Sequence, residues 1–281
     1  MSQSFSDATL ILIGHGSTKN AGSAGPVQQH AAELRRRGIF ADVREAFWKQ
    51  EPGLHDAISN LQTGRVFFIP LFISEGYFSE NVIPHELGFR AEGQGSFNRR
   101  FNRGTQTWFY CQPVGTHAGM TDVLLARARN VVAQFPFPRA PKTKDITLFV
   151  AGHGTEQDEN SRKSIEAQVT KIKSSGLYAD VQATFMEEEP RINECYRLAQ
   201  TKNIVVVPFF MSDGLHVQED IPVLLGEPER IVKQRLQNGQ PTWRNPTGRH
   251  DKLVWYAPAV GTEPGLAEVI LERVSEAEGS G

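Results

Sequence analysis

The sequence predicts an α/β protein built from two tandem doubly wound domains, each with a four-stranded parallel sheet flanked by helices. Two observations predict this fold. Short runs rich in Val, Ile and Phe alternate with longer stretches of helical period, and the same succession of motifs occurs twice within the 281 residues. A chain of this length can bury two cores of ordinary size.

Each copy is expected to have the element order βαβαβαβα. In the first copy the strands are expected near residues 8–14, 41–47, 65–72 and 107–114, and the helices near 19–37, 53–62, 79–88 and 118–133. The third strand, VFFIPLF, and its counterpart IVVVPFF are apolar at nearly every position. Such runs are typical of parallel strands covered by helices on both faces.

The repeat is visible residue against residue. Gly-His-Gly at 14–16 recurs at 152–154, and this offset of 138 holds without a gap for some seventy-five positions. Further on, Val-Gly-Thr at 114–116 recurs at 260–262, so the second copy has eight more residues in one loop. We place the boundary in the Pro-rich stretch 136–145, which gives domains at 1–138 and 139–281.

Composition narrows the class of protein. The formal charge of -2, from 30 basic and 32 acidic residues, gives no reason to expect nucleic acid or an anionic membrane as partner. The two cysteines, Cys111 and Cys195, form neither a disulfide framework nor a CxxC pair. The apolar run at 10–13 is too short for a signal-peptide core or a membrane span. We therefore expect a cytoplasmic protein.

Candidate functional residues lie just after strands of the second copy. Ligands of an open parallel sheet bind outside the carboxyl ends of its strands, and the segments 152–155, 185–190 and 211–222 occupy such positions. They carry His153, His216 and an acidic run at 187–189. We expect only one of the three acids to face the site, because acids are also favoured at a solvated helix start.

His153 and His216 together predict a divalent-metal site. Neutral imidazole is the commonest side-chain ligand for Co²⁺, Ni²⁺, Fe²⁺ and Zn²⁺. Two histidines leave coordination positions open, which suits a metal in transit or in catalysis better than a closed structural site. Either histidine by itself could be an ordinary turn residue. Their joint placement at adjacent strand ends favours the metal site.

The motifs resemble those of the sirohydrochlorin cobaltochelatase family CbiX, in its two-repeat form, and of its siroheme-making ferrochelatase relatives, all class II chelatases. The likeness rests on the Gly-His-Gly turns, on FxExxP at 185–190, and on PxFxSxGxHxxxDIP at 208–222. It implies two chelatase-like domains with a cleft between them, acting without ATP on a tetrapyrrole. The implied substrate metal is Co²⁺, with Fe²⁺ or Ni²⁺ as alternatives, and no organic cofactor is implied.

The resemblance also implies roles for single residues. The family's metal-handling histidines fall on His153 and His216, and its acid falls on Glu187, so these three are the expected catalytic residues. The first copy keeps His15 but has Lys49 and Phe78 at the other two positions. Lysine repels an incoming dication and phenylalanine cannot ligate it, so we expect the second copy to be the working one.

Substrate contacts are expected in the turns beside the histidines and in a basic loop. Glycines suit a turn that a ligand approaches closely. In the segment 90–106, arginines interleaved with phenylalanines suit a flat ring that carries carboxylates, and the first copy would then form a wall or lid. A solvated loop would show the same arginines. The expected substrate-binding residues are Gly152, Gly154, Thr155, Ser212, Gly214, His15, Arg99 and Arg100.

Metal insertion requires the ring to lose two pyrrole protons. We expect the two histidines to receive the metal and Glu187 to accept protons or assist them. A non-catalytic tetrapyrrole or metal carrier is the main alternative. A histidine phosphoesterase is a weaker one, because no Arg directly precedes His15 or His153. The expected partner is the tetrapyrrole, without nucleic acid or membrane, and the expected state is a monomer with internal pseudo-two-fold symmetry.

Overall fold

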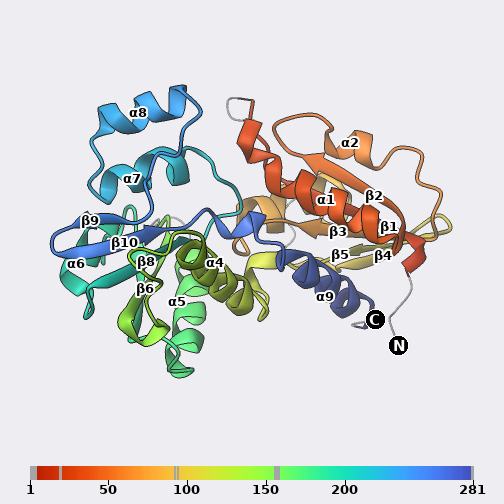
Figure 1. Cartoon of the computed structure of the whole chain (residues 1–281). Helices are drawn as coiled ribbons and strands as arrows, with labels where there is room; N and C mark the ends of the chain where they lie inside the picture. The colour runs from red at the N-terminus through yellow and green to blue at the C-terminus, as the bar shows by residue number, and fades with distance from the viewer. Residues whose placement is uncertain (1–4, 19–20, 92, 94, 155–158, 280–281) are drawn as a thin grey trace. The chain divides into compact units, whose positions relative to one another are not determined.

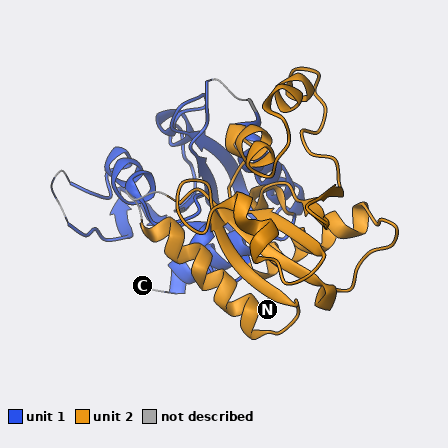
Figure 2. Cartoon of the chain, turned by 90° about the vertical axis from the view of Figure 1, so that its left-hand side faces the viewer, with its two compact units in different colours: residues 1–120, 264–281 blue, residues 121–263 orange. Residues whose placement is uncertain are grey.

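The computed structural model describes residues 5–18, 21–91, 93, 95–154 and 159–279. The chain divides into two compact units, which Figure 2 shows in different colours. Unit 1 comprises residues 1–120 and 264–281, and unit 2 comprises residues 121–263. In the described part of the chain, each unit has one five-stranded sheet.

The two sheets have the same topology. In unit 1 the strand order is β2-β1-β3-β5-β4, and in unit 2 it is β7-β6-β8-β10-β9. The strands of unit 1 are β1 (Phe5–Gly14), β2 (Phe40–Phe47), β3 (Arg65–Pro70), β4 (Arg100–Arg103) and β5 (Gln106–Tyr110). Those of unit 2 are β6 (Ile146–Gly152), β7 (Asp180–Phe185), β8 (Asn203–Pro208), β9 (Thr247–Arg249) and β10 (Lys252–Tyr256).

Four strands of each sheet are parallel, which confirms the doubly wound class, and the fifth was not expected. β4 pairs antiparallel with β5, and β9 pairs antiparallel with β10. Both additional strands are short, polar and partly or fully exposed. They lack the apolar run that marks a buried strand, so periodicity could not show them. An antiparallel strand at the edge of a mostly parallel sheet is common in this class.

The central strands form the cores. Residues 10–13 of β1 and residues 204–207 of β8 have no exposed surface. Fully burying a large aliphatic side chain stabilises the folded state by about 1.5–3 kcal/mol, so these strands require helices on both faces. In unit 1, α1 (Gly25–Arg37) and α9 (Leu266–Gly279) lie side by side on the sheet (Figure 1). In unit 2, α5 (Glu159–Ser174) packs on β6 and β7.

The other helices are mostly short. In unit 1 they are α2 (Leu54–Ala57), the π-helix η2 (Phe78–Val82) and α3 (Ile83–Glu86), with 3-10 turns η1 (Ala21–Ser23) and η3 (Val114–Thr116). The remaining ones are α4 (Met120–Gln134), η4 (Thr143–Asp145), η5 (Ile192–Glu194), α6 (Cys195–Leu198), the π-helix η6 (His216–Asp220), α7 (Ile221–Leu224), α8 (Glu229–Gln237) and η7 (Val260–Thr262). Among the described residues, no helix is long and apolar enough to cross a membrane.

The last helix of each copy belongs to the other copy's unit. α4 follows β5 in sequence but lies in unit 2, and α9 follows β10 but lies in unit 1. An arginine with little exposed surface accompanies each helix, since Arg273 is buried and the side chain of Arg127 is 12% exposed. Arg273 of α9 donates to Thr116 Oγ1 at 2.7 Å, and Arg127 of α4 donates to Thr262 Oγ1 at 2.9 Å. The boundary expected between residues 138 and 139 separates the two copies of the repeat. The compact units instead change at residues 120/121 and 263/264.

Two contacts hold the loop that follows β8. An added Cβ on Gly261 would lie 1.9 Å from the carbonyl oxygen of Met211, so only glycine fits against this loop. Gly115 makes the same approach to Ile73 in unit 1, where the distance would be 2.1 Å. Asp213 Oδ1 in turn accepts a hydrogen bond of 2.7 Å from the Ala259 amide. The loop therefore leads into η6 from a fixed position.

Gly261→Ala is expected to destabilise the protein by about 1–3 kcal/mol or more, because a methyl group there overlaps backbone that cannot move aside cheaply. Gly248→Ala is the matched control, since an added Cβ at this glycine of unit 2 has no atom within 4 Å. Urea unfolding of both variants provides the measurement. Equal stabilities would show that the Met211 contact does not constrain the loop.

Asp213 should make stability depend on pH. Burial raises the pKa of its carboxyl above the ordinary 3.8, opposed by the Ala259 amide and by the charge of Arg127. As pH rises from about 4, the Asp213 carboxyl therefore loses its proton in the unfolded state before it does so in the folded state. The folded state loses stability as pH rises from there through the raised pKa. Asp213→Asn removes this titration, so its stability relative to the unmodified protein should rise between pH 4 and pH 7 in chemical unfolding. A pH-independent difference would contradict the assignment.

Candidate active site

The candidate site lies at the carboxyl ends of three neighbouring strands of unit 2. The order β7-β6-β8 places the reversal of strand order between β6 and β8, which is where open α/β sheets bind ligands. His153 directly follows β6, and His216 begins the π-helix η6 after β8. π-helical turns recur at functional sites. The two histidines that the sequence predicts to act together thus reach the same edge of the sheet.

The two imidazole rings are in contact. Their centroids are 4.9 Å apart and the ring planes meet at 72°, an edge-to-face arrangement. The side chain of His153 is 32% exposed and that of His216 is 51% exposed. An ion arriving from solvent can therefore reach both rings. This pairing is the arrangement that an open two-histidine site requires.

Asp220 orients His216. Its Oδ2 atom lies 2.7 Å from His216 Nδ1, one turn further along the same helical segment. A carboxylate that accepts from one ring nitrogen fixes the tautomer and leaves the other nitrogen, here Nε2, to bind an ion. Phe210 also packs on the His216 ring, with centroids 6.3 Å apart. Sequence reasoning counted Asp220 only as part of a motif, although the His-x-x-x-Asp spacing on a helix indicates such a pair.

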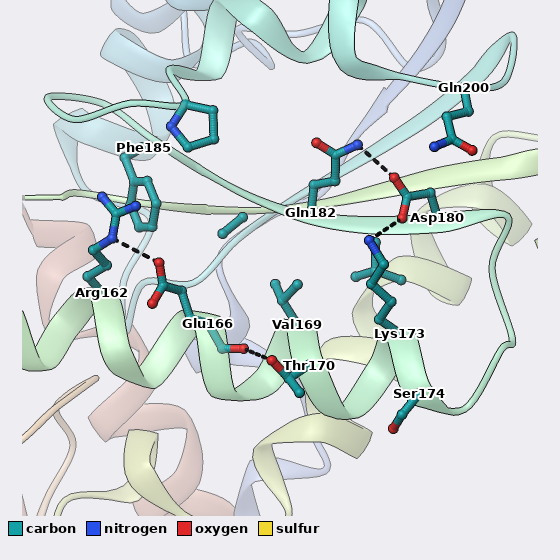
Figure 3. A pocket seen from close by; sticks show the side chains of 13 residues that line it. Arg162, Glu166, Val169, Thr170, Lys173, Ser174, Asp180, Gln182, Phe185 and Gln200 are labelled. Atoms are coloured by element: carbon teal, nitrogen blue, oxygen red, sulfur yellow. Dashed lines mark hydrogen bonds and ion pairs between the residues drawn. The ribbon is translucent and has the colours of Figure 1, made fainter.

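The three consecutive glutamates have different partners. Glu188 Oε2 lies 2.7 Å from Arg162 Nη1, and Glu189 Oε1 lies 3.3 Å from Arg191 Nε. Arg162 itself stacks over Phe185, with its guanidinium carbon 4.6 Å from the ring centroid (Figure 3). Two of the three acids are therefore held by arginines on the flank of the site.

Glu187 is the acid that approaches a histidine. Its Oε1 atom lies 3.8 Å from His153 Nε2, too far for a hydrogen bond. Among the described residues, no group of three or more His, Cys, Asp or Glu side chains is placed to hold a metal ion. The site therefore offers two accessible imidazoles with carboxylates beside them, rather than a closed coordination shell.

The glycines of the first turn are explained by packing. Gly154 has a φ of +65°, and an added Cβ would lie 2.6 Å from the Cβ of Phe185. An added Cβ on Gly152 would lie 2.0 Å from Ile165 Cδ1. Both glycines let the strand end pack tightly and turn. Substrate contact by either one stays a prediction, and Thr155 lies outside the described residues.

Ser212 and Gly214 lie in the loop that leads to His216. The Gly214 carbonyl accepts hydrogen bonds of 3.1 Å and 2.9 Å from the amides of Val217 and Gln218, and so starts the turn of η6. Ser212 lies two residues before it, on the segment held by Asp213. Contacts of Ser212 and Gly214 with substrate stay predictions.

Unit 1 repeats the backbone of the site with other side chains. The Lys49 amide donates to the His15 carbonyl at 2.9 Å, as the Glu187 amide donates to the His153 carbonyl at 3.1 Å. The His15 ring meets Phe78 edge to face, with centroids 4.8 Å apart. Its Nδ1 atom lies 2.9 Å from the Gly16 carbonyl oxygen. The first copy therefore preserves the frame but pairs a histidine with an apolar ring.

Arg99 and Arg100 lie at the antiparallel edge strand of unit 1, where Arg99 directly precedes β4 and Arg100 is its first residue. Arg99 Nη2 forms an ion pair of 2.6 Å with Glu80 Oε2, and its guanidinium carbon lies 5.0 Å from the Phe97 ring centroid. Burial raises the pKa of the Glu80 carboxyl, and Arg99 opposes that rise. Arg100 stacks over Phe109 at 5.3 Å. With Arg273, the two arginines line a hollow of about 500 Å³, and their contact with substrate stays a prediction.

Unit 2 has a hollow of about 760 Å³ that runs along the edge strand β7 and helix α5. An ion pair of 2.8 Å between Lys173 of α5 and Asp180 of β7 joins its two sides, and a second of 2.8 Å between Arg162 and Glu166 lies along α5 (Figure 3). Neither site histidine lines it. The hollow therefore flanks the acidic segment and lies outside the histidine pair.

Two curated proteins are similar to this chain. The probable sirohydrochlorin cobaltochelatase of Halobacterium salinarum is 40% identical over 278 residues, which is 95% of this chain and 91% of that protein. The sirohydrochlorin cobaltochelatase of Methanopyrus kandleri is 31% identical over 141 residues, 48% of this chain but 98% of that protein. The latter therefore has the length of a single copy.

A solved structure and a family model complete the comparison. A multi-domain protein from Deinococcus radiodurans, described as similar in structure to chelatases, matches with a TM-score of 0.77 and 28% identity. The match covers 96% of this chain and 55% of that one, so this chain spans about half of its length. The CbiX family model matches residues 9–131 and again 147–277. The chain belongs to the CbiX family, with both copies of the repeat as members.

Proposed function

We propose that this protein inserts Co²⁺ into sirohydrochlorin or a related tetrapyrrole, as a cytoplasmic enzyme of cobalamin or siroheme synthesis. The observation that carries the proposal is the pair of accessible imidazoles at the strand switch point, with Asp220 fixing the tautomer of His216. The names of the curated relatives support the same reaction. Fe²⁺ and Ni²⁺ are the alternative ions, because two imidazoles with carboxylates accept all three.

The residues of unit 2 divide the work of insertion. The metal must exchange bound water for ring nitrogens, and the two pyrrole N–H groups must lose their protons. His153 and His216 receive the ion while most of its coordination positions remain open to water and to the ring. Glu187, beside His153, accepts a proton or stabilises the imidazolium that accepts one. The surrounding acids draw a dication toward the pair.

Matched substitutions compare the two copies directly. His216→Ala should lower the rate of Co²⁺ insertion by on the order of 100-fold, because it removes a positioned group of the reaction. His15→Ala, the matched change in unit 1, should lower it by less than about tenfold. Absorbance of the ring at saturating and limiting metal gives both rates. A larger loss in His15→Ala would place the working site in unit 1, and binding without faster metallation by the unmodified protein would indicate a carrier.

A substitution of Asp220 tests its role in orienting His216. Asp220→Asn should weaken Co²⁺ binding by roughly 10- to 100-fold, because the amide no longer holds His216 in the tautomer that presents Nε2. Glu219→Gln is the control. It removes the same charge from the same helical segment, but Glu219 pairs with Lys233 at 3.7 Å instead of a histidine. Titration calorimetry with Co²⁺ provides the affinities. Equal losses in both variants would reduce the role of Asp220 to general charge.

A further inference from the structure

The positions that surround the histidine pair of unit 2 are exchanged systematically in unit 1. Two acids of unit 2 approach a histidine of that pair and two more stand next to them in sequence, and none of the four matching positions of unit 1 is acidic. At the offset of 138, the acids Glu187, Glu188, Glu219 and Asp220 correspond to Lys49, Gln50, Asn81 and Val82. At these four positions unit 2 carries four negative charges, which attract a dication. Unit 1 carries one positive charge there, which repels a dication.

The same comparison shows a gain of aromatic rings. Trp48, Tyr77 and Phe78 occupy the places of Met186, Leu215 and His216. Phe78 contacts its neighbours, with ring centroids 4.8 Å from His15, 5.8 Å from Tyr77 and 6.4 Å from Trp48. We call these four residues of unit 1, His15, Trp48, Tyr77 and Phe78, the aromatic shelf.

The aromatic shelf is open to solvent. Tyr77 is 70% exposed and Trp48 is 36% exposed. The other three tryptophans, Trp108, Trp243 and Trp255, are buried. Large aromatic side chains are costly to leave in water unless they contact something there. An exposed pair of rings at the carboxyl ends of parallel strands therefore indicates a ligand with an apolar face.

A hollow of about 630 Å³ adjoins the shelf. Trp48 and Tyr77 line it together with His85, Glu86 and Arg90. The volume falls in the usual range for small-molecule sites. Arg90 is held in place, because its Nη1 donates to the Glu80 carbonyl at 2.8 Å. A fixed guanidinium beside flat rings suits a ligand that is planar and carries carboxylates at its rim.

We propose that the aromatic shelf and this hollow bind one face of the tetrapyrrole, with its rim carboxylates directed to Arg90 and Lys49. Only the identity of the macrocycle rests on the proposed function. A planar conjugated ring stacks on indole and phenol side chains, and its carboxylates would be repelled by the acids that this surface has lost. Glu86 stands among the lining residues as one opposing charge. The two copies then divide the substrates: unit 2 takes the cation and unit 1 takes the anionic ring.

The test measures binding of metal-free sirohydrochlorin to the full chain, without added metal, by calorimetry and by quenching of tryptophan fluorescence. Trp48→Ala and Tyr77→Ala are each expected to weaken binding about tenfold, while Trp48→Phe retains most of it. Lys49→Glu, which restores the acid of the other copy, should weaken binding as well. Co²⁺ affinity, measured without the ring, should stay unchanged in Trp48→Ala and Tyr77→Ala.

Two controls keep the outcome specific. Phe137→Ala removes an aromatic side chain of unit 2 that is 61% exposed and outside the shelf, and it should bind the ring normally. His216→Ala should also bind the ring normally. Unchanged ring affinity in both Trp48→Ala and Tyr77→Ala, an equal loss in Phe137→Ala, or no binding by the unmodified protein would each overturn the shelf. Binding that depends on the shelf without metal insertion would instead overturn the proposed reaction and leave the shelf standing.

Discussion

β6 pairs in register with β7 on one side and with β8 on the other, so that Gly152 lies opposite Phe185 and Ala151 lies opposite Pro208. Because the three parallel strands end at nearly the same level, the residues that follow each strand must meet. The amides of Met186 and Phe209 extend this pairing past the strand ends, to the carbonyls of Gly152 and Ala151. All the chemistry proposed for unit 2 depends on this common edge, because it brings together segments that are distant in sequence.

The same edge exists in unit 1, which shows that the backbone frame and the chemistry are separable. Gly14 lies opposite Phe47 as Gly152 lies opposite Phe185, and glycine meets the neighbouring loop at both Gly115 and Gly261. These positions are tied to backbone geometry and packing, where any side chain would collide. The side chains that point away from the frame are under no such constraint. In unit 2 they include four acids and a second imidazole, and in unit 1 the matching positions carry aromatic, basic and neutral side chains.

Sequence reasoning reached the features that leave a local signal. Continuous apolar runs predict the buried strands. The position of the two histidines, each after one of these strands, predicts that they lie together. Features set by distant contacts left no such signal. Nothing in the stretch 100–103 indicates a strand, because β4 exists only through its hydrogen bonds to β5. Which of the three glutamates at 187–189 approaches His153 likewise depends on the arginines that pair with the other two. The contact between Asp220 and His216 could have been predicted, because the two residues are only four positions apart.

The exchange of α4 and α9 between the units was also beyond what the sequence pattern predicts. Helical period predicts an amphipathic segment at 118–133 but cannot say which sheet it covers. In the structure, Leu266, Ile270 and Val274 of α9 are buried in unit 1, and each such side chain stabilises the buried state by about 1.5–3 kcal/mol. Arg273 on the same helix is buried as well, and it requires the oxygens that Pro113 and Thr116 supply. Each unit therefore needs a helix from the other copy to complete its core. Removal of the first copy would take the buried residues Leu124, Ala128 and Val131 of α4 away from unit 2, so the first copy contributes to packing even though it lacks two of the three site residues.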